Sequence, residues 1–281
     1  MSSTASTQSK VWFVTGASSG FGRCIVEEAI ARGDRVVATA RDPRSLDELV
    51  ALAPDRVHAV RLDVTRPAEI GAAVASAIQR FGAVDVLVNN AGFSIVGALE
   101  ETGEDDLRAT LETMFFGAVA TTRALLPHMR ARRTGTVVQI TSVGGVVTAP
   151  GFGPYCAAKH ALEAVSESLA AELAPFGVRV LIVEPGAFRT SLFGAAFRTM
   201  PAMDAYATTV GPTRAYVASE AGHQAGDPAK AAKAIADAVA AGAPQLRLPL
   251  GADAVASIRD KLAKVAADVD RAERVAAATA F

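Results

Sequence analysis

Near the start of the chain, a glycine-rich turn separates a short apolar run from a segment with helical periodicity. The run at 11–15 is typical of a buried parallel strand, and the turn covers 16–22. A helical face follows at 23–32, and Gly33 stands where a helix commonly ends. Since a second apolar run follows at 35–40, we predict a βαβ unit with an anion site at the N-terminus of its helix.

The same alternation of apolar runs and amphipathic segments continues along the chain. Further strands are expected at 57–62, 84–88, 137–140, 178–183 and 245–248. Helices are expected at 65–80 with Thr65 as its cap, 104–129, 155–175, 228–241 after the cap Asp227, and 252–278. This order predicts an α/β fold: a Rossmann-type, doubly wound parallel sheet of about seven strands, with helices on both faces, in a single domain.

The domain organisation follows from where the periodicity stops. Residues 1–10 are rich in Ser and Thr and predict a mobile N-terminal tail, and 251–281 predict a C-terminal helical extension of the domain at 11–250. Residues 191–226 mix Gly, Pro, Thr and apolar residues, which predicts a substrate lid or a loop packed by its own side chains. The residues expected to line an apolar pocket from this lid are Leu192, Phe193, Phe197, Met200, Met203 and Tyr206.

Composition excludes several classes of function. The net charge of −1 and the lack of a basic patch argue against nucleic-acid binding, and no apolar run is long enough to span a membrane. Cys24 and Cys156 are too few for a disulfide framework or a zinc site, and the four His have no metal-ligand spacing, so no metal is expected. We expect a cytoplasmic protein that acts on a small molecule.

The stretch from Ser142 to Lys159 carries the clearest chemical signal. Tyr155 and Lys159 are four residues apart, and Pro154 suits the first turn of a helix, so both side chains lie on one face. A Tyr titrates at about 10, and lowering that by three units takes roughly 4 kcal/mol, which a nearby cation can supply. The pair is therefore a candidate proton donor, although two residues can also share a helix face by accident.

The end of the second predicted strand bears on the choice of cofactor. An enzyme selective for NAD carries an acid there to hold the ribose 2′-hydroxyl, but this chain reads Thr39-Ala40-Arg41-Asp42. Arg41 suits a 2′-phosphate, and Asp42 belongs to the turn before the next helix. The alternative is that Arg41 is a solvated loop residue. We expect NADP(H) to be preferred, with NAD(H) possible.

Taken together, the motifs resemble those of the short-chain dehydrogenase/reductase family. The chain carries Thr-Gly-x-x-x-Gly-x-Gly at 15–22, Asn-Asn-Ala-Gly at 89–92 and Tyr-x-x-x-Lys at 155–159. A Ser lies thirteen residues before the Tyr, and Pro-Gly with a downstream Thr occurs at 185–190. The ordered set spans about 11–190, and this order makes it far more specific than any single motif.

The resemblance implies an NAD(P)-dependent oxidoreductase of the ketone reductase or alcohol dehydrogenase type, acting on a carbonyl or alcohol. It implies that Tyr155 is the acid/base, that Lys159 lowers the pKa of Tyr155 and binds the nicotinamide ribose, and that Ser142 holds the substrate oxygen. With Arg41 added, the expected cofactor-binding residues are Gly16, Ser18, Ser19, Gly20, Phe21, Gly22, Arg41, Asp63, Val64, Asn90, Ala91, Gly92, Tyr155, Lys159, Pro185, Gly186 and Thr190. It also implies a homodimer or homotetramer, formed through the helices at 104–129 and 155–175.

One position departs from the family pattern. Many members place an Asn where this chain has Met114, and a thioether cannot donate a hydrogen bond, so that side chain takes no part in a proton relay. A water on the backbone carbonyl of Met114 could complete the relay, and we expect a working enzyme. An apolar substrate is expected from 93–97, 143–147 and the lid. The competing interpretations are an NADP-binding sensor without turnover, and an epimerase or dehydratase of nucleotide sugars.

Overall fold

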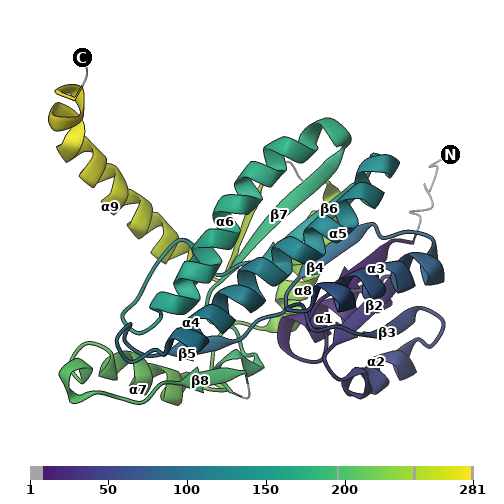
Figure 1. The fold of residues 1–281 in the computed structure, drawn as a ribbon, viewed down its shortest axis with the longest axis horizontal. Coiled ribbons are helices and arrows are strands. Elements are labelled where there is room, and N and C mark those ends of the chain that lie inside the picture. The colour runs from purple at the N-terminus through teal and green to yellow at the C-terminus, as the bar shows by residue number, and fades with distance from the viewer. Residues whose placement is uncertain (1–8, 195, 243–244, 280–281) are drawn as a thin grey trace.

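Seven parallel strands form the central sheet of the computed structural model, which describes residues 9–194, 196–242 and 245–279 (Figure 1). The strand order is β3-β2-β1-β4-β6-β7-β9, with every neighbouring pair parallel. The strands are β1 (Val11–Val14), β2 (Arg35–Ala40), β3 (Val57–Arg61), β4 (Val86–Asn89), β6 (Gly135–Ile140), β7 (Val178–Pro185) and β9 (Arg247–Leu250). The predicted single-domain α/β fold and its seven-stranded sheet are confirmed.

Helices cover both faces of this sheet, as a parallel sheet requires. One apolar layer joins the sheet to α1 (Gly20–Ala31), α2 (Asp47–Leu52) and α8 (Pro228–Ala241). The other joins it to α3 (Pro67–Phe81), α5 (Gly117–Arg132) and α6 (Gly153–Leu173). The chain winds outward in one direction from β1 to β3 and in the other from β4 to β9, so a crevice opens where β1 meets β4.

Several helix ends behave as their residues predict. Gly33 and Gly82 follow α1 and α3 with φ of 83° and 78°, a left-handed conformation that glycine adopts without steric cost. Asp227 caps α8 by accepting the backbone N–H of Ala229 at 2.9 Å. The prediction for Thr65 is wrong, because its hydroxyl donates to Asp63 Oδ1 at 2.7 Å and α3 begins later without a side-chain cap.

The long helix predicted at 104–129 is interrupted by a wider turn. It consists of α4 (Glu104–Leu111), a π-helical turn at Glu112–Phe116 and α5, which continues to Arg132. At the end of that turn, the N–H of Gly117 bonds to the carbonyl of Glu112, five residues back. A π-turn leaves a backbone carbonyl without its usual helical partner and is frequent at functional sites. The turn contains Met114.

The region predicted to be irregular contains ordered elements. Strand β8 (Phe197–Thr199) pairs in parallel with β5 (Ser94–Val96), so that Ile95 lies opposite Arg198. Helix α7 (Gly211–Glu220) follows in the same segment. Sequence periodicity missed both strands because three residues are too few to display it. Short 3₁₀ turns complete the fold: η1 (Pro43–Leu46), η3 (Val143–Gly145), η4 (Ala174–Phe176), η5 (Ser191–Phe193) and η6 (Asp204–Tyr206).

The two ends of the chain differ in how they are held. The part of the predicted N-terminal tail at 1–8 lies outside the described residues, whereas Ser9 and Lys10 hydrogen-bond Gly33 and Asp34. At the other end, α9 (Ala252–Ala277) projects from the body of the protein (Figure 1). Within the described ranges, no helix has the length and apolarity needed to cross a membrane.

Candidate active site

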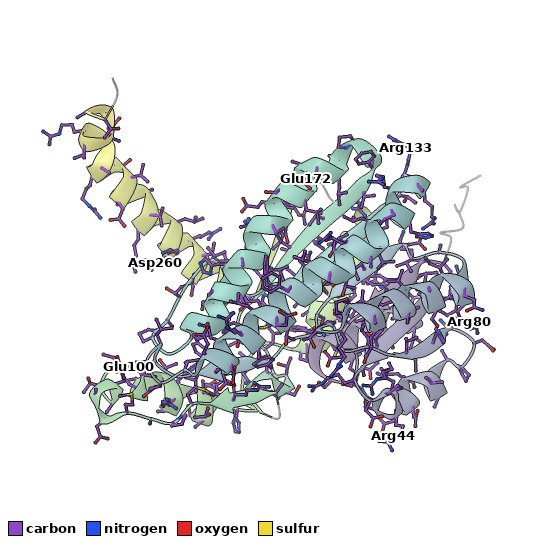
Figure 2. All side chains as sticks on the ribbon, viewed as in Figure 1. Arg44, Arg80, Glu100, Arg133, Glu172 and Asp260 are labelled. Carbon is purple, nitrogen blue, oxygen red and sulfur yellow. The ribbon has the colours of Figure 1, made fainter. Side chains whose placement is uncertain are left out.

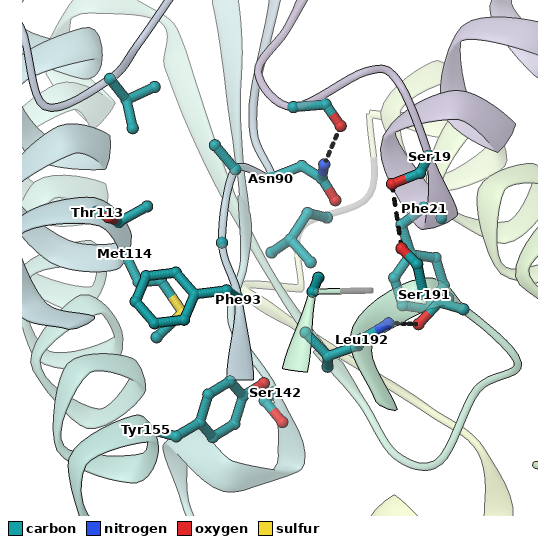
Figure 3. A pocket seen from close by; sticks show the side chains of 18 of the residues that line it. Ser19, Phe21, Asn90, Phe93, Thr113, Met114, Ser142, Tyr155, Ser191 and Leu192 are labelled. Carbon is teal, nitrogen blue, oxygen red and sulfur yellow. Dashed lines mark hydrogen bonds between the residues drawn. The ribbon is translucent and has the colours of Figure 1, made fainter. Parts of the chain in front are cut away.

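A cavity of about 660 Å³ opens at the carboxyl ends of the central strands, where the strand order reverses. Its wall is built from the loops after β1, β2, β3, β4, β6 and β7. Every site residue predicted from the sequence lines this cavity except Gly22. Several of them, including Ser19, Asn90, Ser142 and Tyr155, face one another across the opening (Figure 3).

Gly22 does not line the cavity but lies behind its wall, where α1 packs against the glycine turn. A Cβ at this position would lie 2.3 Å from the carbonyl oxygen of Gly16, so only glycine allows α1 to approach the turn this closely. Gly16 itself has a φ of 66°, and a Cβ there would lie 2.9 Å from the Cα of Ala91. The glycine turn therefore presents bare backbone to the cavity next to the N-terminus of α1, as an anion site requires.

Asn90 holds that turn in place. Its side-chain amide donates to the carbonyl oxygens of Thr15 at 2.9 Å and Gly16 at 3.0 Å (Figure 3 draws one such bond). In return, the hydroxyl of Thr15 accepts the backbone N–H groups of Asn90 and Ala91. The loops after β1 and β4 are thus tied together, and this tie shapes the wall of the cavity.

The Ser, Tyr and Lys predicted to act together do converge. Ser142 follows β6, and its hydroxyl accepts the N–H of Gly144 at 2.9 Å. Tyr155 lies in the first turn of α6, next to Ser142 (Figure 3), and Pro154 occupies that first turn as predicted. The ammonium of Lys159 donates to the carbonyl of Ile140 at 2.8 Å and lies 5.8 Å from the centre of the Tyr155 ring.

Burial is the main influence on the pKa values of Tyr155 and Lys159. Tyr155 is 8% exposed, and burial raises its pKa to about 12, against the opposing effect of a hydrogen bond with Ser142. Burial also lowers the pKa of Lys159 to about 8, with Glu163 acting in the opposite direction. That the ammonium of Lys159 lowers the pKa of the Tyr155 phenol stays a prediction, because burial is the largest influence on the pKa of each group and at Tyr155 it outweighs the hydrogen bond with Ser142.

The lowered pKa of Lys159 should appear in the pH dependence of stability. Its folded value of about 8 lies below its ordinary 10.5, so above pH 8 the unfolded chain binds more protons than the folded one. We expect the free energy of unfolding to rise by about 2 kcal/mol from pH 8 to 10 in the wild type relative to Lys159→Met, as measured by urea denaturation. Above pH 10 the raised pKa of Tyr155 acts in the opposite direction. Parallel pH profiles for the two proteins would contradict this expectation.

A charge cluster that contains two buried glutamates lies next to Lys159. The guanidinium of Arg247 on β9 pairs with the carboxylates of Glu163, one helical turn after Lys159, and Glu184 on β7. The two glutamates are 5% and 1% exposed. Arg247 also pairs with the exposed Glu167, while Glu163 Oε1 finds no hydrogen-bond partner among the described residues. Burial, together with repulsion from Glu163, raises the pKa of Glu184.

The predicted apolar lining is largely wrong. Among the lid residues, Leu192 lines the cavity, whereas Met200 does not and is buried in an apolar cluster with Ile95 behind the cavity wall. Met203 is 41% exposed, and the hydroxyl of Tyr206 donates to Glu100 away from the cavity. Phe197 is half-buried without lining the cavity, the side chain of Phe193 lies outside the described residues, and 143–147 do not line the cavity either.

The cavity wall contains three further side chains, those of Phe93, Arg198 and Met114. Phe93, from the segment 93–97 predicted to be apolar, lines the cavity, and the guanidinium of Arg198 lies 4.3 Å from the centre of its ring. Arg198 also pairs with Asp106 at 3.0 Å. Met114 is 2% exposed, and a Cβ on Gly92 would lie 3.1 Å from its sulfur. Arg198 was missed because β8 reaches the site only through its pairing with β5.

The lid contacts the glycine turn across the cavity. The hydroxyls of Ser19 and Ser191 are 3.1 Å apart (Figure 3), and Thr190 accepts the N–H of Leu192 at 3.3 Å.

Arg41 lies exposed at the rim of the cavity, near Asp63. Burial acts to raise the pKa of Asp63, but two hydrogen bonds from Thr65 and the charges of Arg66 and Arg41 together lower it. No group of metal-ligating side chains occurs within the described ranges.

Comparison with known proteins identifies the family. Residues 10–201 match the family described as short chain dehydrogenase. This chain belongs to the short-chain dehydrogenase family. Oxidoreductase BOA17 of Botryotinia fuckeliana (strain B05.10) is 38% identical over 247 residues, which cover 88% of this chain and 90% of that relative. Membership makes the chain an oxidoreductase.

Solved structures of similar proteins agree with this fold. One from Streptomyces avermitilis is 52% identical with a TM-score of 0.92, and the match covers 97% of this chain and 100% of that chain. The 3-ketoacyl-(acyl-carrier-protein) reductase of Brucella melitensis, solved with NADH, is 28% identical with a TM-score of 0.71. That match covers 86% of this chain and 96% of the reductase.

Proposed function

We propose that this short-chain dehydrogenase transfers a hydride reversibly between NADP(H) and an apolar ketone or secondary alcohol, with Tyr155 as the acid/base. The observation that carries the proposal is the convergence of Ser142, Tyr155 and Lys159 on one wall of a cavity whose opposite wall is the glycine turn. The NADH-bound reductase of Brucella melitensis supports a nicotinamide dinucleotide as the class of cofactor. A nicotinamide bound here would supply the hydride chemistry.

The cavity wall fits such a cofactor. The turn at 16–22 leaves backbone N–H groups free of side chains beside a helix N-terminus, which suits a pyrophosphate. Asp63 and Val64 would contact the adenine, and Asn90, Ala91 and Gly92 the ribose. On the side of the lid, the residues that would face the nicotinamide are Pro185, Gly186 and Thr190.

The protonation states support a reductive reaction at neutral pH. With a pKa of about 12, Tyr155 keeps its proton and is ready to donate it to the oxygen of a ketone undergoing reduction. Ser142, beside it, would hold that oxygen by a hydrogen bond. Lys159 lies within 5.8 Å of the Tyr155 ring, so its positive charge would stabilise the phenolate left after the transfer.

The choice between NADP(H) and NAD(H) rests on Arg41. We expect Arg41→Ala to raise the KM for NADPH by about 10- to 100-fold, the value of a charge-assisted hydrogen bond, and to leave the KM for NADH near wild type. Arg44→Ala is the matched control, because Arg44 is also exposed but pairs with Asp42 and does not line the cavity. If Arg41→Ala has the same preference for NADPH over NADH as the wild type, Arg41 does not select the cofactor.

Met114 bears on the route of the proton beyond Lys159. Its side chain cannot relay a proton, but it lies in the π-turn at Glu112–Phe116, where a backbone carbonyl is free to hold a water. We therefore expect Met114→Asn to change kcat by less than about tenfold, since general acid–base assistance as a whole contributes 10²- to 10⁴-fold. The control is Met114→Leu. An increase of several orders of magnitude in the Asn variant would show that the native relay is defective.

Activity itself is tested with a panel of ketones and secondary alcohols, followed at the nicotinamide absorbance with NADPH and NADH. Turnover of an apolar ketone with NADPH is expected. A sensor protein would bind NADPH without turning over any member of the panel. The buried trio argues against a sensor, because burying a Tyr and a Lys together costs stability that binding alone does not require.

A further inference from the structure

The C-terminal helix α9 carries a regular apolar stripe. Its apolar residues recur at alternating spacings of three and four, which are the first and fourth positions of a heptad. Those positions hold Val255, Ile258, Leu262, Val265, Val269 and Ala272. Sustained over almost three heptads, this pattern is typical of a helix that packs along a second helix.

Most of that stripe is left exposed by the residues that the structure describes. Leu262 is 57% exposed, Val265 41% and Val269 64%. The helix stands away from the body in Figure 1, and Figure 2 shows its side chains, Asp260 among them, projecting with no second element alongside. Within the described part of the chain, contacts at the base of the helix hold it to the body: Ala254 is buried, and Asp253 accepts the N–H of Ala187 at 2.7 Å. Apolar side chains aligned in this way gain stability when a partner covers them.

We propose that α9 pairs antiparallel with α9 of a second copy of this chain. In an antiparallel pair, first positions of one helix meet fourth positions of the other. Leu262 then packs against Val265 of the second copy, and Ile258 packs against Val269 of the second copy. This contact is separate from the helices at 104–129 and 155–175, through which the family resemblance implies association.

The charges beside the stripe favour the antiparallel direction. In that register Lys261 of each copy lies beside Asp268 of the other, which gives two opposite-charge pairs. A parallel pair would instead bring Asp268 of one helix beside Glu273 of the other, a repulsive contact. Charge complementarity thus selects both the direction and the register.

The shape and net charge of α9 point to the same partner. Residues 252–277 contain five basic and five acidic side chains, whereas helices that lie on anionic lipid surfaces are rich in Lys and Arg. A parallel pair would crowd two protein bodies at one end, because each helix starts at its own body (Figure 1). The antiparallel pair places the bodies at opposite ends of the contact.

The first experiment compares masses of the full-length protein by sedimentation equilibrium at tens of micromolar. Leu262→Glu/Val265→Glu is expected to halve the mass of the wild-type assembly. The matched control Ala256→Glu/Ala263→Glu adds the same charge to exposed positions outside the stripe and is expected to leave the mass unchanged. Equal masses for wild type and the Leu262→Glu/Val265→Glu variant would overturn the proposal, as would a monomeric wild type that binds phosphatidylglycerol vesicles.

The second experiment determines whether the two α9 helices pair antiparallel or parallel. Ile258→Cys and Val269→Cys are prepared as separate proteins, and the native Cys24 and Cys156, half-buried and buried, serve as the blank. After mild oxidation, an equimolar mixture is expected to give a dimer linked between the two variants, while each variant alone gives none. Residues 258 and 269 are about 16 Å apart on one helix, too far for a disulfide within a chain. Cross-linking of either variant alone would indicate a parallel pair and overturn the proposal.

The third experiment tests the charge pairs. Lys261→Glu places like charges beside Asp268 twice in each dimer and is expected to weaken self-association several-fold. The double variant Lys261→Glu/Asp268→Lys restores opposite charges and is expected to recover it. Because these positions are seven residues apart in one helix, no contact within a chain explains such a recovery. A double variant that associates as weakly as the single one would overturn the register.

Discussion

Replacing Tyr155 with Phe is expected to lower kcat by about 10²- to 10⁴-fold while leaving the affinity for NADPH near wild type. The substitution removes one hydroxyl from a residue that is 8% exposed, so the ring keeps its packing and only the proton donor is lost. Steady-state rates with an apolar ketone would measure the loss, and isothermal titration calorimetry would measure cofactor binding separately.

Tyr206→Phe is the control for this experiment. It removes a hydroxyl that hydrogen-bonds Glu100 at the surface, neither residue lines the cavity, and it is expected to leave kcat unchanged. A Tyr155→Phe protein that retains kcat within tenfold of wild type would exclude Tyr155 as the proton donor. A protein that loses cofactor affinity to the same extent would show that its hydroxyl acts in binding instead.

The second large effect concerns stability. Arg247→Met is expected to lower the free energy of unfolding by about 3 kcal/mol, the lower end of the usual cost of removing one partner from a buried ion pair, since the Arg247 side chain is 35% exposed. The cost arises because Glu184 and Glu163, which are 1% and 5% exposed, would lose the guanidinium with which both carboxylates pair. Urea denaturation at neutral pH would measure the change.

The control and the rescue for Arg247→Met both come from the same chain. Lys233→Met breaks an exposed pair with Asp237 one turn away on α8 and is expected to cost less than about 1 kcal/mol. Adding Glu163→Gln and Glu184→Gln to Arg247→Met should recover part of the stability, since the unpaired charges are then gone. An Arg247→Met protein as stable as Lys233→Met would contradict the burial argument.

The sequence predicted those parts of the fold that have a recognisable pattern over a few neighbouring residues. Strand β1 at Val11–Val14 is a continuous apolar run, and α8 begins at its Asp-Pro signal. Parallel strands align their carboxyl ends at one edge of the sheet, so the residues that follow them meet there. For that reason the order of motifs along the chain is enough to assign the glycine turn, Asn90 and Ser142 to one cavity.

The parts that the sequence missed depend on partners far along the chain. Strand β8 exists because Ser94–Val96 lies beside it, about a hundred residues away, and its Arg198 reaches the cavity by that pairing. The π-turn at Met114 shifts one hydrogen bond within a helix without changing the apolar spacing around it. Neither event leaves a periodic signal that a single sequence displays.

The Tyr155–Lys159 pair shows most clearly which properties follow from the sequence and which follow from the tertiary structure. The sequence by itself determined that the two side chains share a helix face, because residues four apart in a helix are neighbours. Only the tertiary structure decided their protonation: burial raises the pKa of Tyr155 to about 12 and lowers that of Lys159 to about 8. The physical reason is that a pKa depends on the solvent and charges that surround a group, and here these are set by strands and loops from the whole length of the chain.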